Sequence, residues 1–213
     1  MPSYDDFLSE LDNDIETAFK KYKLDFNTQE FDIKNGVYQT GIDFVFRDPN
    51  IILMKKDDKS EKKATYMTWA RKSAVSVTLD SKSPPYFMTS HLSGCRMTLK
   101  FHDDARHSVT VMHVAGDTSS GTTWNGSKQR DKLEEQVDIP APVKLERRLS
   151  VTGFKMNGKT GPQKMEKVLA KGGTTFYDSL ARCFGVRGED NKWRFYVQNL
   201  NNDEQIIGFF EIV

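Results

Sequence analysis

The chain has 213 residues, and its 31 basic and 30 acidic side chains give a formal net charge of +1 at neutral pH. This length suits one sizeable core, and no Pro/Gly/Ser-rich linker divides the sequence, so we expect a single domain over residues 1–213. Balanced charge argues against a nucleic-acid or membrane binder, because such proteins concentrate charge of one sign on one face.

The start of the chain, MPSYDDFLSELDNDIE, is acidic and lacks the basic region and apolar core of a signal peptide. We therefore expect synthesis in the cytoplasm without a cleaved signal peptide. The two cysteines, Cys95 and Cys183, have no setting that marks them as partners, so we expect free thiols.

A helix is predicted at the start, because Ser3 before Asp5 and Asp6 is typical of a helix N-terminus. The apolar residues that follow share one helical face: Phe7, Leu8, Leu11, Ile15, Ala18 and Phe19.

Beyond Asn35-Gly36 apolar residues tend to recur at every second position, a pattern that predicts β-strands. These cover 41–47, 51–55, 64–70, 74–79, 95–101 and 108–114. The charge run KKDDKSEKK, residues 55–63, is interpreted as a solvated hairpin tip.

The second half mixes both patterns. It predicts helices near 127–135 and 163–170, a strand at 143–154, and a final antiparallel meander of strands at 181–186, 192–198 and 206–212. Helices at separate points among hairpin-linked strands argue for an α+β layered sandwich.

Cys95 and all four histidines (His91, His102, His107 and His113) lie within residues 91–113. A cysteine nucleophile normally needs an imidazole or another positive group to favour the thiolate. If Phe101 pairs with His107 across a five-residue loop, Cys95 lies opposite His113 on one face, with Cβ atoms roughly 4.5–5.5 Å apart. A slip of one residue would separate them.

The residues before Cys95 suit the same chemistry. Gly94 leaves room beside the sulfur for a substrate carbonyl, and a nearby backbone N–H could stabilise an oxyanion. Thr89 could hold the imidazole in the useful tautomer.

The pattern Trp69…Phe87-x-Thr89-x-x-Leu92-Ser93-Gly94-Cys95…Val111-x-His113 resembles the catalytic core of the cytotoxic necrotizing factor and Burkholderia lethal factor family. Those toxins are protein-glutamine deamidases, and chemotaxis receptor deamidases share a similar Thr, Cys, His order. The resemblance covers roughly residues 65–116. It implies an α+β sandwich with a mixed or antiparallel central sheet flanked by helices.

The same resemblance implies a hydrolase that converts a target glutamine to glutamate through a Cys95–His113 dyad. Thr89 would orient the imidazole, and the backbone from Ser93 and Gly94 to Cys95 would supply oxyanion donors. No metal or organic cofactor is required.

In that role we expect a monomeric bacterial toxin or effector, a virulence factor that would act in the host cytosol after delivery. The expected partner is a host protein, such as a signalling GTPase or a translation factor, with no nucleic acid and no membrane.

Several alternatives stay open. His107 competes with His113 for the dyad, His91 is interpreted as a rim residue, and His102 as a turn residue. His91, Cys95, His107 and His113 could instead form a zinc site, although their spacing fits no compact finger pattern. The same dyad would serve a cysteine peptidase, and a non-enzymatic interaction module could bury both residues as core.

Overall fold

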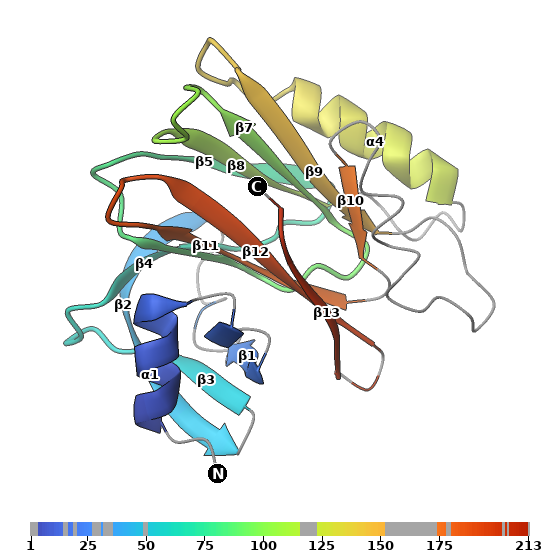
Figure 1. Ribbon diagram of the computed structural model, residues 1–213. Coiled ribbons are helices and arrows are strands. Elements are labelled where there is room, and N and C mark those ends of the chain that lie inside the picture. Colours follow the sequence, from blue (N-terminus) through green and yellow to red (C-terminus); the bar gives the residue numbers. More distant parts are fainter. Residues whose placement is uncertain are drawn as a thin grey trace.

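The computed structural model describes residues 4–14, 17–18, 21–26, 31, 36–48, 51–115, 123–151, 174–177, 180–201, 203 and 205–212. Within these ranges the protein consists mostly of strands in two sheets, with helices α1, Tyr4–Asn13, and α4, Thr123–Glu135 (Figure 1). No helix in the described part of the chain is long and apolar enough to cross a membrane.

The larger sheet has eight strands and contains both parallel and antiparallel pairs. Its spatial order is β1 (Lys23–Phe26), β3 (Ile51–Lys56), β2 (Val37–Asp48), β4 (Lys63–Met67), β6 (Tyr86–Thr89), β11 (Leu180–Arg187), β12 (Trp193–Leu200) and β13 (Ile206–Glu211).

The smaller sheet has five strands, which are antiparallel except for the parallel pair β10 and β9. Its order is β10 (Thr174–Tyr177), β9 (Leu145–Val151), β7 (Arg96–Phe101), β8 (Val109–Ala115) and β5 (Ser73–Leu79).

The expectation of one central sheet flanked by helices was wrong. Two sheets pack against each other instead, the larger one curls, and residues in strands greatly outnumber residues in helices in the described ranges (Figure 1). The protein is therefore α+β or mainly β at the level of class. Apolar residues alternate with polar ones along the strands, so each sheet has one apolar face, and these two faces pack against each other. The second sheet therefore covers the apolar face that we expected helices to cover.

The predicted strands are found with ends moved by a few residues, but β1, β6 and β10 were not predicted. Each of the three has only four residues, too few for alternation to appear. The helix predicted near 127–135 is α4, which begins earlier, at Thr123. The helical pattern at 163–170 and the apolar positions Ile15 and Phe19 lie outside the described residues.

The charge run at 55–63 is not a hairpin tip, because β3 and β4 lie on opposite edges of β2. Asp57 N donates to Gly41 O, whereas Ile42 N donates to Lys62 O on the other edge. The connection therefore crosses the face of β2 at Gly41, where a Cβ would lie 2.0 Å from Asp57 O. Glycine permits this crossing.

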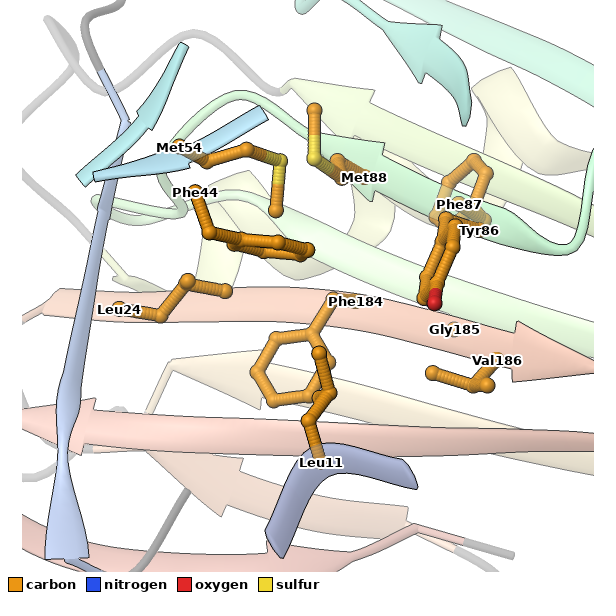
Figure 2. A pocket seen from close by; sticks show the side chains of 10 residues that line it. All are labelled: Leu11, Leu24, Phe44, Met54, Tyr86, Phe87, Met88, Phe184, Gly185 and Val186. Atoms are coloured by element: carbon orange, nitrogen blue, oxygen red, sulfur yellow. The ribbon is translucent and has the colours of Figure 1, made fainter. Parts of the chain in front are cut away.

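Two apolar cores result. The N-terminal core packs α1 against one face of the larger sheet, where Phe7 contacts Tyr22 and Phe44 edge to face. Figure 2 shows a gap in this core, lined only by carbon-rich side chains and large enough for no more than about one water molecule.

The inter-sheet core lies between the two sheets and contains Phe87, Met97, Val111 and Phe195. It is the core that positions the candidate site, because Cys95 packs against it.

Candidate active site

The β7–β8 hairpin carries the two central residues, but with a register different from the expected one. Phe101 pairs with Val109 rather than His107, so Met97 lies opposite His113. The expectation that Cys95 directly opposes His113 was wrong by two residues. An even shift preserves the face, and Cys95 precedes the first residue of β7. Continuing the ladder by one residue would make Cys95 and His113 diagonal neighbours, with Cα atoms about 7–8 Å apart and Cβ atoms somewhat closer.

The register differs because the connecting loop is longer than expected. It spans residues 102–108 and is closed by a hydrogen bond from His102 N to Ser108 O. The Asp103 carboxylate accepts from His107 N at 3.0 Å and from Ser108 N at 2.8 Å, and Arg106 adopts a positive φ of 63°. Side-chain capping of this kind stabilises a loop that alternation in the strands does not reveal.

Thr89 lies in the other sheet, at the end of β6, and its hydroxyl is 2.7 Å from His113 Nδ1. The same hydroxyl donates its one proton to Met67 O at 2.9 Å, because a carbonyl can only accept. His113 Nδ1 must therefore be the protonated nitrogen, donating to Thr89 Oγ1. This assignment leaves a lone pair on Nε2.

The Nε2 atom of His113 is buried and has no hydrogen-bond partner among the described residues. The whole side chain is buried, and burial lowers its pKa from 6.5 to about 3. His113 is thus a neutral imidazole near pH 7, with an unprotonated nitrogen available to accept a proton.

Cys95 is a free thiol and is partly buried. Burial raises its pKa, while the Ser93 backbone N–H and the charge of Arg130 act in the opposite direction. The thiol is therefore protonated near neutral pH, and an attack by sulfur requires a base that takes this proton.

The backbone at Gly94 and Cys95 is held by two side chains from distant elements. Tyr177 of β10 accepts from Gly94 N at 2.9 Å and donates to Cys95 O at 2.7 Å. Burial raises the pKa of Tyr177 well above 10, so the phenol keeps the proton that it donates. Arg130 of α4 donates through Nη1 to Gly94 O at 2.9 Å. Gly94 has φ 95°, a conformation that favours glycine.

These contacts change which backbone donors can serve an oxyanion. The Gly94 N–H, expected as such a donor, is taken by Tyr177, and the Ser93 N–H faces the Cys95 sulfur. The Cys95 N–H is the candidate that remains in this segment.

The other histidines lie elsewhere. His107 is exposed at the loop end of the hairpin, opposite the end that carries Cys95. His102 lies within hydrogen-bond distance of Pro142 O and of Thr110 Oγ1. His91 is half-buried, and its Nε2 accepts from Arg182 Nε at 3.0 Å.

No group of three or more His, Cys, Asp or Glu side chains is arranged to hold a metal ion in the described part of the chain. Cys183 is fully buried in β11 of the inter-sheet core. A surface hollow over Gly41, Lys63 and Lys82 contains none of the predicted site residues.

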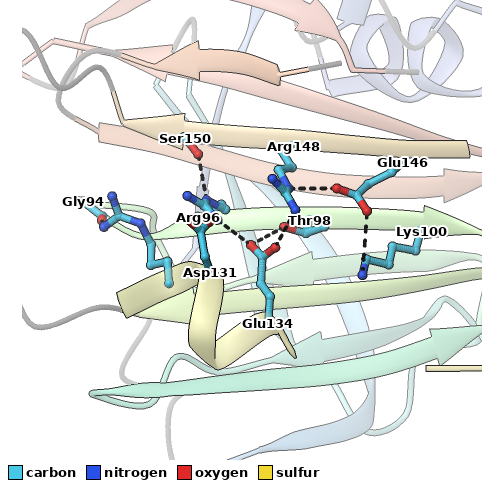
Figure 3. A network of polar contacts seen from close by, with 10 residues as sticks. Gly94, Arg96, Thr98, Lys100, Asp131, Glu134, Glu146, Arg148 and Ser150 are labelled. Carbon is cyan, nitrogen blue, oxygen red and sulfur yellow. Dashed lines mark hydrogen bonds and ion pairs between the residues drawn. The ribbon is translucent and has the colours of Figure 1, made fainter. Parts of the chain in front are cut away.

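Behind the site, α4 is fixed to the outer face of the smaller sheet by a buried ionic network (Figure 3). Glu134 accepts from Arg96 at 3.0 Å and from Thr98 at 2.8 Å, and it lies 3.1 Å from Arg148. Asp131 adds a 2.7 Å contact to Arg96.

Tyr177 and Arg130 were missed by sequence reasoning. They lie 82 and 35 residues beyond Cys95, and nothing in their local pattern marks them. The one available signal was their residue types, because Tyr and Arg are bulky donors that suit buried backbone oxygens.

No profile of a protein family matches the sequence, and no curated protein matches it. Among solved structures, the chain is similar to the C-terminal domain of CNFy from Yersinia pseudotuberculosis, with a TM-score of 0.45 and 9% identity. The similarity covers 82% of this chain and 71% of that chain, and it is a weak likeness of fold.

Proposed function

We propose that the protein is a protein-glutamine deamidase in which Cys95 is the nucleophile, His113 the general base and Thr89 the residue that orients the imidazole. The observation that carries this proposal is the hydrogen-bond chain from His113 Nδ1 through Thr89 Oγ1 to Met67 O. This chain fixes the tautomer in which Nδ1 is protonated and Nε2 has a lone pair. His113 lies on the sheet face that also carries Cys95. The motif from Thr89 to His113 supplies the choice of reaction by its resemblance to glutamine deamidases.

The first half of the proposed reaction forms a thioester. His113 Nε2 takes the thiol proton as Cys95 Sγ attacks the carboxamide carbon of the target glutamine. The tetrahedral oxyanion accepts a hydrogen bond from the Cys95 N–H. The C–N bond then breaks, and the imidazolium returns its proton to the departing ammonia.

The second half hydrolyses the thioester. His113 Nε2 takes a proton from water, the resulting hydroxide oxygen bonds to the acyl carbon, and the C–S bond breaks. The thiolate recovers the proton from the imidazolium, and the target leaves with glutamate in place of glutamine. One water is consumed and one ammonia is released, and neither half requires a metal or an organic cofactor.

By the same resemblance, we propose that the chain is one catalytic domain that acts as a monomer on a host protein, such as a signalling GTPase or a translation factor. This places it among bacterial toxins and effectors that work in the host cytosol after delivery.

The decisive experiment incubates a mammalian cell lysate with the protein and maps the peptides by mass spectrometry. We expect specific glutamine sites to be converted to glutamate, with release of ammonia. Cys95→Ser, which retains size but forms no thiolate, is the matched control and should give no conversion.

New N-termini without ammonia would identify a peptidase that uses the same dyad. An absence of both products, together with a Cys95 thiol that resists iodoacetamide in the folded protein, would identify an interaction module.

A further inference from the structure

Arg130 occupies an unusual position for a guanidinium. Its side chain comes from the face of α4 that covers the smaller sheet, it is 6% exposed, and its Nη1 binds the carbonyl of Gly94, the residue before the nucleophile. Its Nε is buried without a hydrogen-bond partner among the described residues.

The carboxylates around Arg130 are engaged by other cations. Asp131 and Glu134 pair with Arg96, and Glu134 also pairs with Arg148. No carboxylate of the described residues lies within ion-pair distance of Arg130 itself. Its charge is therefore buried without a paired anion, a costly arrangement unless an anion forms nearby.

We propose that Arg130 is a positioning residue for the proposed nucleophile: anchored on the Gly94 carbonyl, its guanidinium supplies the positive charge that stabilises the Cys95 thiolate. The inference rests on the proposed function only in taking Cys95 as the nucleophile.

The chemistry of the site explains why such a charge is needed. The thiol proton moves to His113, whose buried ring tolerates a positive charge poorly, so sulfur becomes an anion in an apolar setting. A cation anchored on the carbonyl of Gly94, the residue before Cys95, would stabilise the thiolate when it forms and when it leaves the thioester.

The electrostatics of the neighbouring groups agree with this role. Burial lowers the pKa of Arg130, as does the like charge of Arg96, whereas Tyr177, Cys95 and Asp131 act in the opposite direction. For Cys95, burial raises the pKa, and the Ser93 N–H and Arg130 lower it. The charge of Arg130, held at the Gly94 carbonyl, thus opposes the effect of burial on the pKa of Cys95.

The test measures the rate of Cys95 alkylation by iodoacetamide against pH, with the modified peptide assigned by mass spectrometry. Arg130→Gln should move the midpoint of the profile upward by about one pH unit or more. Below the midpoint this shift corresponds to alkylation that is roughly tenfold slower. Arg130→Lys, which keeps the charge but not the planar fork, should give a smaller shift.

Arg148→Gln is the matched control, because it removes a cation from the ionic network next to Arg130 and does not contact Gly94. Its profile should coincide with that of the wild type. A coincident profile for folded Arg130→Gln, as judged by circular dichroism, would overturn the proposal.

A second measurement needs no variant and decides the matter if Arg130→Gln does not fold. The wild type is alkylated in parallel with anionic iodoacetate and neutral iodoacetamide, and the rate ratio is compared with that of glutathione. The positive charge of Arg130 should raise the ratio of the iodoacetate rate to the iodoacetamide rate above the value for glutathione. An equal or lower ratio would contradict the proposal.

Neither measurement uses a protein substrate. A shifted profile without any deamidation would therefore leave Arg130 in this role and reject the proposed reaction, whereas deamidation with an unshifted profile would do the reverse.

Discussion

The hydroxyl of Thr89 and the Nδ1 of His113, 2.7 Å apart, join the two sheets of the protein at the candidate active site. Thr89 ends β6 of the larger sheet, and His113 lies in β8 of the smaller one. The orientation of the imidazole thus depends on how the two sheets pack, in addition to the hairpin that carries both His113 and Cys95.

Thr89→Val should reduce single-turnover deamidation by roughly 10–1000-fold, since a misoriented general base raises the barrier by a few kcal/mol. Valine keeps the shape of threonine but removes the oxygen that fixes the tautomer of His113. Thr89→Ser, which keeps the hydroxyl, is the matched variant and should restore most of the rate. Equal rates for folded Thr89→Val and wild type would separate Thr89 from the mechanism.

Cys95→Ser should fold like the wild type and lose deamidation entirely, because a serine hydroxyl does not form the anion at neutral pH without a far stronger base. The measurement is glutamate formation in the target, alongside thermal unfolding of both proteins. Cys183→Ser serves as the comparison: its thiol is buried away from the site, so it should alter stability rather than chemistry. Toxicity or turnover that survives in Cys95→Ser would remove Cys95 from the reaction.

The depressed pKa of His113 predicts how stability depends on pH. The unfolded chain binds a proton at this residue below about 6.5, whereas the folded protein does so only near pH 3. Stability from this residue is therefore complete above pH 6.5 and declines as pH decreases toward 3, by about 1.4 kcal/mol per pH unit.

Urea unfolding at several pH values tests this dependence. The amide of Asn in His113→Asn can still donate to Thr89. In this variant the free energy of unfolding should no longer decrease between pH 6.5 and pH 3 by the amount due to His113. His107→Asn should retain the slope, because His107 is an exposed loop residue. Parallel slopes for wild type and His113→Asn would show that His113 is not buried as a neutral ring.

Glu134→Gln should destabilise the protein by about 3 kcal/mol, because it leaves the buried Arg96 guanidinium with a weaker partner. Asp131→Asn should cost less than about 1 kcal/mol, since 48% of the Asp131 side chain is exposed. Denaturant midpoints measured at one pH compare the two. A similar loss of unfolding free energy in both variants would mean that burial does not determine how much each ion pair contributes to stability.

The local pattern of the chain was sufficient for some features of the site. Strict alternation placed Cys95 on the same face as Met97, and His113 on the same face as Val111. Because the error in register was even, Met97 and His113 still share one face of the hairpin. Alternation could not give the register, which depends on capping by Asp103 in a loop of irregular backbone.

Local sequence patterns were therefore enough for the face of each strand residue and for the approximate position of the longer strands, since both follow from the two-residue period of an extended chain. The packing of distant segments sets three further contacts: Thr89 with His113, Tyr177 with Gly94 and Cys95, and Arg130 with Gly94. These contacts join segments 24 to 83 residues apart, and they depend on how two sheets and a helix pack. Packing of that kind is set by the sum of many distant side chains, so no local window of sequence contains it.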